Sequence, residues 1–357
     1  MNNYQIGKML PKGCEKVKNS AKKFMCLSLV FVLIFSLCSC GEKEDAGNTS
    51  EFYAMDTLVD VTLKGDGAED ALSQIETLVN DLDINYLSRT STTSNISKLN
   101  RGKVFTLDPL LVGYFTTLVM INNQSGGAFN FTMGKLSDLW GFTDENPSVP
   151  DDADIKDLAN ECNNGSVMFD SETNNIYFSS SGLSLDMGAV GKGIALDEIK
   201  KQVLDGSTLT ECVAAVGGSV IVWGERDFTV GIKDPNSAGY IATLTLPACC
   251  VSTSGNYERY FEEDGKRYHH ILDPETGYPV DNGLASVTIV AESGTVSDAL
   301  STACFVLGIE EGMALCEKFG VEAIFVTEEK EIHTSAATAE HLEINDSSYT
   351  LVITDEK

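Results

Sequence analysis

Apolar side chains recur along most of this chain at the two periods that distinguish helices from strands. Leu72, Ile75, Leu78, Val79 and Leu82 follow the helical period and predict a helix over residues 68–82. Further helices are expected near residue 96 and at 108–122, 152–161, 189–204, 296–307 and 310–319. Strands are expected at 52–63, 167–170, 175–179, 213–223, 228–233, 241–246, 248–253, 285–291, 323–327, 332–334 and 349–354. Because strands come in runs with helices between them, the pattern predicts an α+β fold with mostly antiparallel sheets and packed helices.

The most distinctive segment, residues 252–280, contains a further pair of predicted strands. Strands at 257–261 and 267–272 are joined by Glu263-Asp264-Gly265-Lys266, a connection typical of a hairpin. The second strand ends in His269 and His270, and the turn-forming run Asp273-Pro274-Glu275-Thr276-Gly277 follows. A hairpin that ends in two imidazoles and a rigid turn indicates a way of directing a histidine toward a ligand.

The start of the chain has the pattern of a targeting segment. A lysine-rich stretch precedes an apolar run, residues 24–37, which is short for a membrane span. The following Leu37-Cys38-Ser39-Cys40-Gly41 resembles the processing site of a bacterial lipoprotein. We therefore expect residues 1–39 to be a signal peptide and Cys40 to be lipidated. A plain secretory signal or an uncleaved anchor is the alternative.

The rest of the chain is divided by composition into a short tether and a long folded region. Residues 40–50 are polar and charged, which predicts a flexible tether behind the lipidated cysteine. Residues 51–357 are expected to form one large domain or two closely packed lobes. The expected location is the extracytoplasmic face of the cell membrane, with the protein held there by its lipid.

The charge balance is strongly acidic, with 53 Asp and Glu against 25 Lys and Arg and a net charge of −28. Such a balance argues against a nucleic-acid partner. An anionic ligand would have to be held by backbone N–H groups, by a few local cations or by a metal. The cysteines of the folded region show no CxxC spacing, and Cys212, Cys304 and Cys316 lie in apolar patterns typical of core residues.

Two glycine-rich segments carry candidate chemistry. Residues 183–193 run from an apolar segment through Gly188, Gly191 and Gly193 into a predicted helix, so backbone N–H groups could approach a phosphate there. Lys192 would supply a cation and Asp186 a polar contact, although an ordinary glycine-rich turn is the competing interpretation. Gly217 and Gly218 interrupt the strand predicted over 213–223, which favours either a ligand close to the backbone or a β-bulge.

Two further patterns add an aromatic surface and a possible metal site. Glycines alternate with aromatic residues over 126–134 and again at Trp140 and Phe142, which favours the wall of a pocket for a planar ring, with core packing as the alternative. Asp298 and Thr302 lie four residues apart in a predicted helix and therefore share one face. A carboxylate and a hydroxyl are hard oxygen ligands of the kind that Mg²⁺ prefers.

These segments occur together in an order that resembles the ApbE family of FAD:protein FMN transferases. The resemblance covers residues 52 to about 327 and is carried by AMDTLVDVTL, SGGAFNFTMGKLSDLWGF, LSLDMGAVGKGIALD, VGGSVIVWG, TSGNYERYF, YHHILDPETGYPV and SDALSTACFVLG. It implies an ApbE or T-fold-like architecture. It also implies Mg²⁺-dependent transfer of FMN from FAD to a Thr or Ser hydroxyl of an acceptor protein, with release of AMP.

The resemblance also implies which residues form the site. Those expected to contact FAD are Met55, Thr90, Ala128, Phe129, Asn130, Asp186, Lys192, Gly217, Gly218, Ser254, Gly255, His270 and Ile271. The Ala189 carbonyl, Asp298 and Thr302 would hold Mg²⁺. From the chemistry of the residues themselves, we expect His270 to be the general base, because the ordinary pKa of histidine lies near neutrality, with a structural hydrogen bond to the Asp273 turn as the alternative. Lys192 would stabilise charge at the phosphates, and His269, one residue away on a strand, would face the opposite side. The chain departs from the family pattern at Asp56, Thr90, Asn130 and Lys135.

Two other functions are compatible with the same residues. One is an FAD pyrophosphatase, in which water attacks instead of an acceptor hydroxyl. The other is a lipid-anchored flavin-binding protein without turnover. For a transferase, the resemblance points to acceptors among extracytoplasmic flavin-bearing subunits of membrane redox complexes or secreted electron-transfer proteins. The chain itself contains no Asp-x-x-Thr-Gly-Ala-Thr-like acceptor motif.

Overall fold

The computed structural model describes residues 47–102, 105–170 and 172–354. Cys40, the predicted signal peptide and most of the predicted tether lie outside these residues. A nine-stranded sheet in the order β1-β2-β5-β6-β9-β12-β13-β14-β16 forms the centre of the fold. Its strands span Asn48–Ala54, Thr57–Gly65, Leu209–Val216, Ser219–Gly224, Cys249–Gly255, Leu284–Ala291, Glu322–Thr327, Glu331–Thr334 and Thr350–Ile353. All of its neighbouring strands are antiparallel except β14 and β16, so the predicted α+β fold is confirmed.

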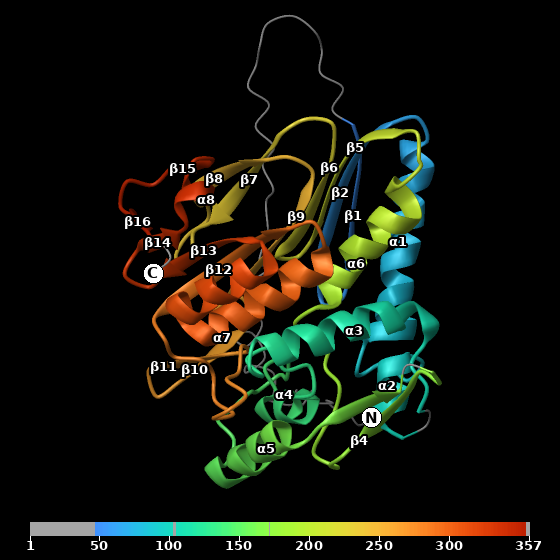
Figure 1. Ribbon diagram of the computed structural model, residues 1–357, viewed down its shortest axis with the longest axis vertical. Helices are drawn as coiled ribbons and strands as arrows, with labels where there is room; N and C mark the ends of the chain where they lie inside the picture. The colour runs from blue at the N-terminus through green and yellow to red at the C-terminus, as the bar shows by residue number, and fades with distance from the viewer. Residues whose placement is uncertain (1–46, 103–104, 171, 355–357) are drawn as a thin grey trace, which may run out of the picture.

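The central sheet is covered on both faces (Figure 1). Helices α1 (Ala68–Asp81), α6 (Gly191–Ile199) and α7 (Gly294–Phe319) pack on one face, and the small sheet β15-β8-β7 packs on the other. The strands of the small sheet are Leu342–Ile344, Tyr240–Leu246 and Phe228–Lys233. Strand β5 therefore buries side chains in both directions: Cys212 and Ala214 face the helices, while Val213 and Ala215 face the small sheet. This double burial explains its unbroken apolar run.

Most of the remaining elements gather at one end of the central sheet, below α7 in Figure 1. The helices among them are η1 (Leu82–Leu87), α2 (Asn95–Asn100), α3 (Pro109–Gln124), α4 (Gly134–Trp140), α5 (Asp152–Asn164), η2 (Lys200–Leu204) and α8 (Ala336–Ala339). The strands are β3 (Val167–Asp170), β4 (Asn175–Phe178), β10 (Tyr260–Glu263) and β11 (Lys266–His269). The predicted N-cap Asp108 accepts a hydrogen bond from the Leu110 amide at 3.0 Å, which confirms the predicted start of α3.

An aromatic cluster ties the β10–β11 hairpin to α4. Trp140 stacks on Phe142 and lies 5.7 Å from Tyr268 of β11, centroid to centroid. Its indole N–H donates to the Gly277 carbonyl at 2.9 Å, in the turn that follows the hairpin. Trp140 is buried in this core. Of the four aromatic residues in the segments predicted to line a pocket, Phe129 and Phe142 do so, whereas Phe131 and Trp140 are core residues. The cluster fixes the end of β11, where the histidine pair lies.

Two predicted strands are wrong, because each is a hairpin of two strands. Residues 52–63 turn at Met55 and Asp56, which both adopt positive φ (53° and 56°) although neither is glycine. Residues 213–223 turn at Gly217 and Gly218, so these glycines form neither a strand interior nor a bulge. The two turns are neighbours, since the Gly217 amide donates to the Leu58 carbonyl at 3.1 Å. Gly217 has φ +58°, and a Cβ there would lie 2.7 Å from Thr57 Oγ1.

Helix α7 is two helices in series, as predicted, because Gly308 interrupts it at φ 79°. By length and composition α7 could cross a membrane, but half of its most apolar window is buried inside the protein. The hydrophobic pattern did not predict η1, α4, α8 or β15. The segment before α6 makes a single bridge, Met133 to Ser184, instead of a strand.

Helices α6 and α7 approach each other through glycine. A Cβ on Gly193 would lie 2.1 Å from the Gly294 carbonyl oxygen, far inside van der Waals contact. A Cβ on Gly294 would in turn lie 2.5 Å from the Gly193 carbonyl oxygen. The two backbones can therefore cross this closely only while both positions lack a side chain.

We expect Gly193→Ala to lower the free energy of unfolding by at least about 2 kcal/mol, because backbone atoms must move to admit the methyl group. Gly113→Ala in α3 is the matched control, since no atom lies within 4 Å of a Cβ there. A helical alanine at that position should instead be neutral or gain up to about 1 kcal/mol. Urea denaturation of both variants measures the difference. A Gly193→Ala protein as stable as the unaltered chain would contradict the close crossing.

Candidate active site

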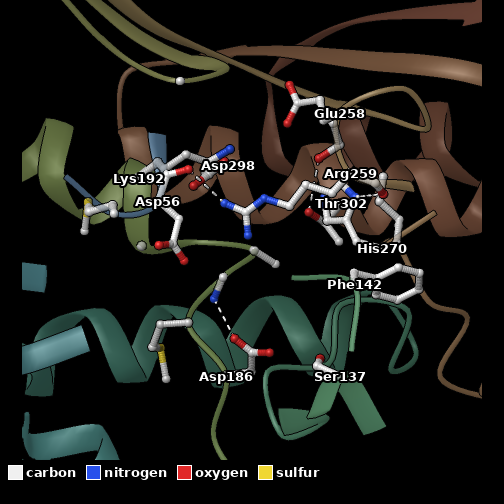
Figure 2. A pocket seen from close by; sticks show the side chains of 18 of the residues that line it. Asp56, Ser137, Phe142, Asp186, Lys192, Glu258, Arg259, His270, Asp298 and Thr302 are labelled. Carbon is white, nitrogen blue, oxygen red and sulfur yellow. Dashed lines mark hydrogen bonds between the residues drawn. The ribbon is translucent and has the colours of Figure 1, made fainter. Parts of the chain in front are cut away.

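A cavity of about 330 Å³ opens where the two tight turns, the N-terminus of α6 and the end of β11 meet (Figure 2). It brings together nearly all of the residues predicted to form the site. Those lining it are Met55, Thr90, Ala128, Phe129, Asn130, Asp186, Ala189, Lys192, Gly217, Gly218, Ser254, His270, Ile271, Asp298 and Thr302. Gly255 is not among them, because it is buried behind the wall and faces the ring of Tyr257. Segments separated by more than 200 residues thus share one cavity.

Asp298 is the most deeply buried charged group of the cavity, with 3% of its surface exposed. One carboxylate oxygen accepts from the Gly193 amide at 2.9 Å and the other from the Ser219 hydroxyl at 3.0 Å. Burial raises the pKa of this carboxyl, and the charge of Lys192 and these two hydrogen bonds oppose the rise. The carboxylate is therefore held rigidly in surroundings where a cation is needed to stabilise its charge.

The predicted metal ligands fit a hard divalent cation. Asp298, the Thr302 hydroxyl and Ala189 line the same cavity, and all would offer oxygen. Thr302 Oγ1 lies 3.2 Å from Ser254 Oγ, and Ser254 Oγ also lies 2.8 Å from the Ser301 hydroxyl. Ser254, which belongs to β9, therefore orients the side chain of Thr302. The described residues contain no group of three or more His, Cys, Asp or Glu arranged around a common point. One carboxylate with neutral oxygens is a set that fits Mg²⁺ completed by water and phosphate oxygens.

Lys192 is placed at the first turn of α6, beside the glycine-rich approach to that helix. Among the described residues it has no hydrogen bond or ion pair. Its ammonium group lowers the pKa of both Asp298 and His270, which places its field at the centre of the cavity. A cation at a helix N-terminus favours the binding of an anion such as phosphate. The Gly191 and Gly193 amides there already donate, to the Met187 carbonyl and to Asp298, so Lys192 is the main group available to that anion.

His270 faces the cavity and His269 does not. The His270 Nδ1 lies 3.3 Å from the Arg259 carbonyl oxygen, which only accepts, so Nδ1 carries the proton and Nε2 keeps a free lone pair. Burial, followed by the charges of Arg259 and Lys192, lowers the pKa of His270 to about 3. His269 bonds the Val280 carbonyl oxygen at 2.8 Å and packs edge-on against Phe305. The imidazole that reaches the cavity is therefore neutral, and its neighbour holds the hairpin end in place.

The opposite wall is formed by polar loops that are already hydrogen bonded. Asn130 Oδ1 accepts from the Thr132 amide at 3.0 Å and from the Thr132 hydroxyl at 2.7 Å, which makes a compact turn. Asp186 accepts from the Gly188 amide at 2.9 Å and pairs with Arg89 at 3.4 Å. Arg89 also pairs with Asp138. These bonds fix the shape of the wall where the resemblance places the flavin.

Several cavity residues were not found from the sequence. Arg89, Arg259, Glu258 and Asp83 all line the cavity. The Asp83 carboxylate accepts from the Met55 amide at 2.9 Å and thereby supports the strained Met55–Asp56 turn. A partial signal was available for Arg259, because cations are scarce in so acidic a chain and it lies within TSGNYERYF, whereas Arg89 lies in none of the segments that carry the resemblance.

Comparison with known proteins agrees with this geometry. The model of the ApbE family matches residues 55–325. The FAD:protein FMN transferase of Treponema pallidum (strain Nichols) is 31% identical over 351 residues, which is 90% of this chain and 96% of that protein. The FAD:protein FMN transferase of Klebsiella pneumoniae (strain 342) is 38% identical over 228 residues, or 63% of this chain and 71% of that protein.

A solved structure supports the same assignment. The crystal structure of the ApbE protein from Thermotoga maritima superposes with a TM-score of 0.75 at 30% identity, covering 82% of this chain and 98% of that one. The resemblance drawn from the motifs is thereby confirmed: this chain belongs to the ApbE family.

Proposed function

We propose that this protein transfers FMN from FAD to a Thr or Ser hydroxyl of an extracytoplasmic acceptor protein and releases AMP, in a reaction that requires Mg²⁺. The observation that carries the proposal is the convergence of a buried carboxylate, a free lysine and a neutral imidazole on one cavity. Relatives of this chain that bear the name FAD:protein FMN transferase support it. The lipoprotein-like start supports an extracytoplasmic location on the membrane.

The cavity supplies the groups that phosphoryl transfer needs. Asp298, Thr302 and the Ala189 carbonyl would hold Mg²⁺, which neutralises charge on the FAD pyrophosphate. Lys192, at the start of α6, would bind the phosphate oxygens and stabilise the charge that grows on them as AMP leaves. The Gly188, Gly191 and Gly193 amides are already hydrogen bonded within the protein, so they would contribute less than the glycine-rich pattern predicts. Most of the catalytic effect in this proposal is positioning and charge stabilisation, as is usual for phosphoryl transfer.

The acceptor hydroxyl loses a proton when it attacks the phosphorus on the FMN side of FAD. The new bond is a phosphoester between that oxygen and FMN, and the bond that breaks is the anhydride to AMP. His270 would receive the proton at Nε2, because its Nδ1–H is held by the Arg259 carbonyl. The low pKa keeps His270 in the neutral form that can accept this proton at neutral pH.

The first test mixes the full chain, solubilised in detergent, with FAD, Mg²⁺ and a protein carrying an Asp-x-x-Thr-Gly-Ala-Thr-like motif. We expect the acceptor to gain the mass of one FMN with one AMP released, and both to be lost in EDTA or with Asp298→Asn. Intact-mass spectrometry and nucleotide chromatography measure the two products. FMN and AMP without a mass gain would indicate a pyrophosphatase, and intact FAD bound to the protein would indicate a carrier. Either result contradicts the transferase.

The lowered pKa of His270 predicts an unusual pH profile. A histidine with an ordinary pKa would lose its base form as the pH falls through about 6.5, whereas His270 should keep it until the pH approaches about 3. We therefore measure kcat/KM from about pH 5 to about pH 8 with saturating Mg²⁺, and expect a profile without a step near pH 6.5. His270→Ala should lower the rate about 10²- to 10⁴-fold at every pH. An activity that is half lost near pH 6.5 would show that the imidazole titrates normally.

A further inference from the structure

The side chain of Arg259 crosses the cavity. Arg259 lies between β9 and β10 and extends toward Asp56, Lys192 and Asp298, with His270 beside the start of its side chain (Figure 2). Its guanidinium donates one hydrogen bond, at 3.2 Å, to the backbone carbonyl of Asp56. That partner is a neutral oxygen. Within the part of the chain that the structure describes, the guanidinium of Arg259 therefore reaches the cavity without an ion pair.

The other arginine of the cavity differs in this respect. Arg89 pairs with both Asp138 and Asp186, and so its charge is matched within the wall. Arg259 has no ion pair within 4.0 Å among the described residues, although the chain carries a net charge of −28. A guanidinium has roughly five N–H donors in a planar fork, and only one hydrogen bond is made here. Arg259 thus keeps most of its capacity to bind an oxyanion.

The backbone of Arg259 places that capacity beside the proposed base. Its carbonyl oxygen accepts from the His270 amide at 3.0 Å and lies 3.3 Å from His270 Nδ1. The guanidinium and the imidazole are therefore attached to one rigid connection. In the proposed reaction, His270 deprotonates the attacking hydroxyl, and that oxygen must lie close to the phosphorus atom. The phosphorus atom would therefore lie near the guanidinium as well.

We infer that Arg259 is a phosphate-binding residue, whose guanidinium leaves the Asp56 carbonyl and binds oxygens of the FAD pyrophosphate on the FMN side. This inference rests on the proposed function and adds a residue to it. Two parallel N–H···O bonds from a planar fork match a phosphoryl group in a way that the point charge of a lysine does not. Lys192 from α6 and Arg259 from the β9–β10 connection would then hold the pyrophosphate from two different elements.

A purely structural role is the alternative, in which Arg259 only supports the strained Met55–Asp56 turn. That turn already has other supports, because the Met55 amide donates to Asp83 and Ala54 pairs with Thr57 at the end of the β1–β2 ladder. The two roles make different predictions. A phosphate-binding residue affects only ligands that carry phosphate, whereas a structural residue affects every ligand of the cavity.

The test measures dissociation constants of the full chain for FAD, ADP and riboflavin in EDTA, without acceptor, so that no turnover is needed. Riboflavin carries the flavin ring without phosphate, and ADP carries phosphates without the flavin. Arg259→Gln should weaken FAD and ADP about 10- to 100-fold, as expected for the loss of charge-assisted hydrogen bonds, and should leave riboflavin unchanged. Arg259→Lys should recover part of the FAD affinity, because it keeps the charge without the fork.

Arg267→Gln is the matched control on the same hairpin. Arg267 is exposed and stacks over Tyr260 at 4.3 Å outside the cavity lining, so all three affinities should be unchanged. An FAD affinity within threefold of the unaltered chain in Arg259→Gln would overturn the inference. Equal weakening of FAD and riboflavin would also overturn it, because it would show a structural role. Since the assay needs no transfer, a failure of the transferase proposal is detected separately.

Discussion

The whole site depends on the burial of one carboxylate, Asp298, where α6 and α7 meet strand β6. An uncompensated buried charge costs several kcal/mol, and each hydrogen bond to it returns about 1.5–3 kcal/mol. The Gly193 amide and the Ser219 hydroxyl supply two such bonds. The Gly193 bond exists only because Gly193 and Gly294 let the two helices cross at a distance that no side chain would permit. Since burial still raises the pKa of Asp298, the fold leaves this carboxylate in need of a cation.

Around this fixed point, the cavity is formed by ends of elements, and each end is held by a different means. The turn at Met55 and Asp56 is supported by Asp83, and the neighbouring turn at Gly217 fits against Thr57 because it has no Cβ. The end of β11 is held by the aromatic cluster around Trp140. These supports do not use Lys192 or the His270 Nε2, so both groups remain available to a ligand. Polar groups on rigid supports are what positioning of a phosphoryl group requires.

The segments that carry the chemistry could be found from the sequence because each is locally unusual. Adjacent histidines before a rigid turn, and glycines before a helix, stand out in any chain. The turn at Gly217 was misassigned for a physical reason: β5 is buried on both faces, so its apolar run continues into β6 and hides the break. The turn at Met55 was missed because neither of its residues is glycine. Ser219 and Arg259 lie within segments that carry the resemblance, but their roles were not predicted, since these roles arise from contacts with residues far along the chain.

The charges of the cavity also link substrate binding to the strength of the base. Lys192 and Arg259 are cations without ion pairs in the part of the chain that the structure describes, and both lower the pKa of His270. Burial is the larger cause of the low pKa of His270, and the field that attracts a phosphate adds to it, so the imidazole is neutral before a phosphate binds. A phosphate bound between the two cations would offset their effect on His270, because a nearby negative charge raises the pKa of an imidazole. The imidazole would then become a stronger base when the group to be transferred is in place.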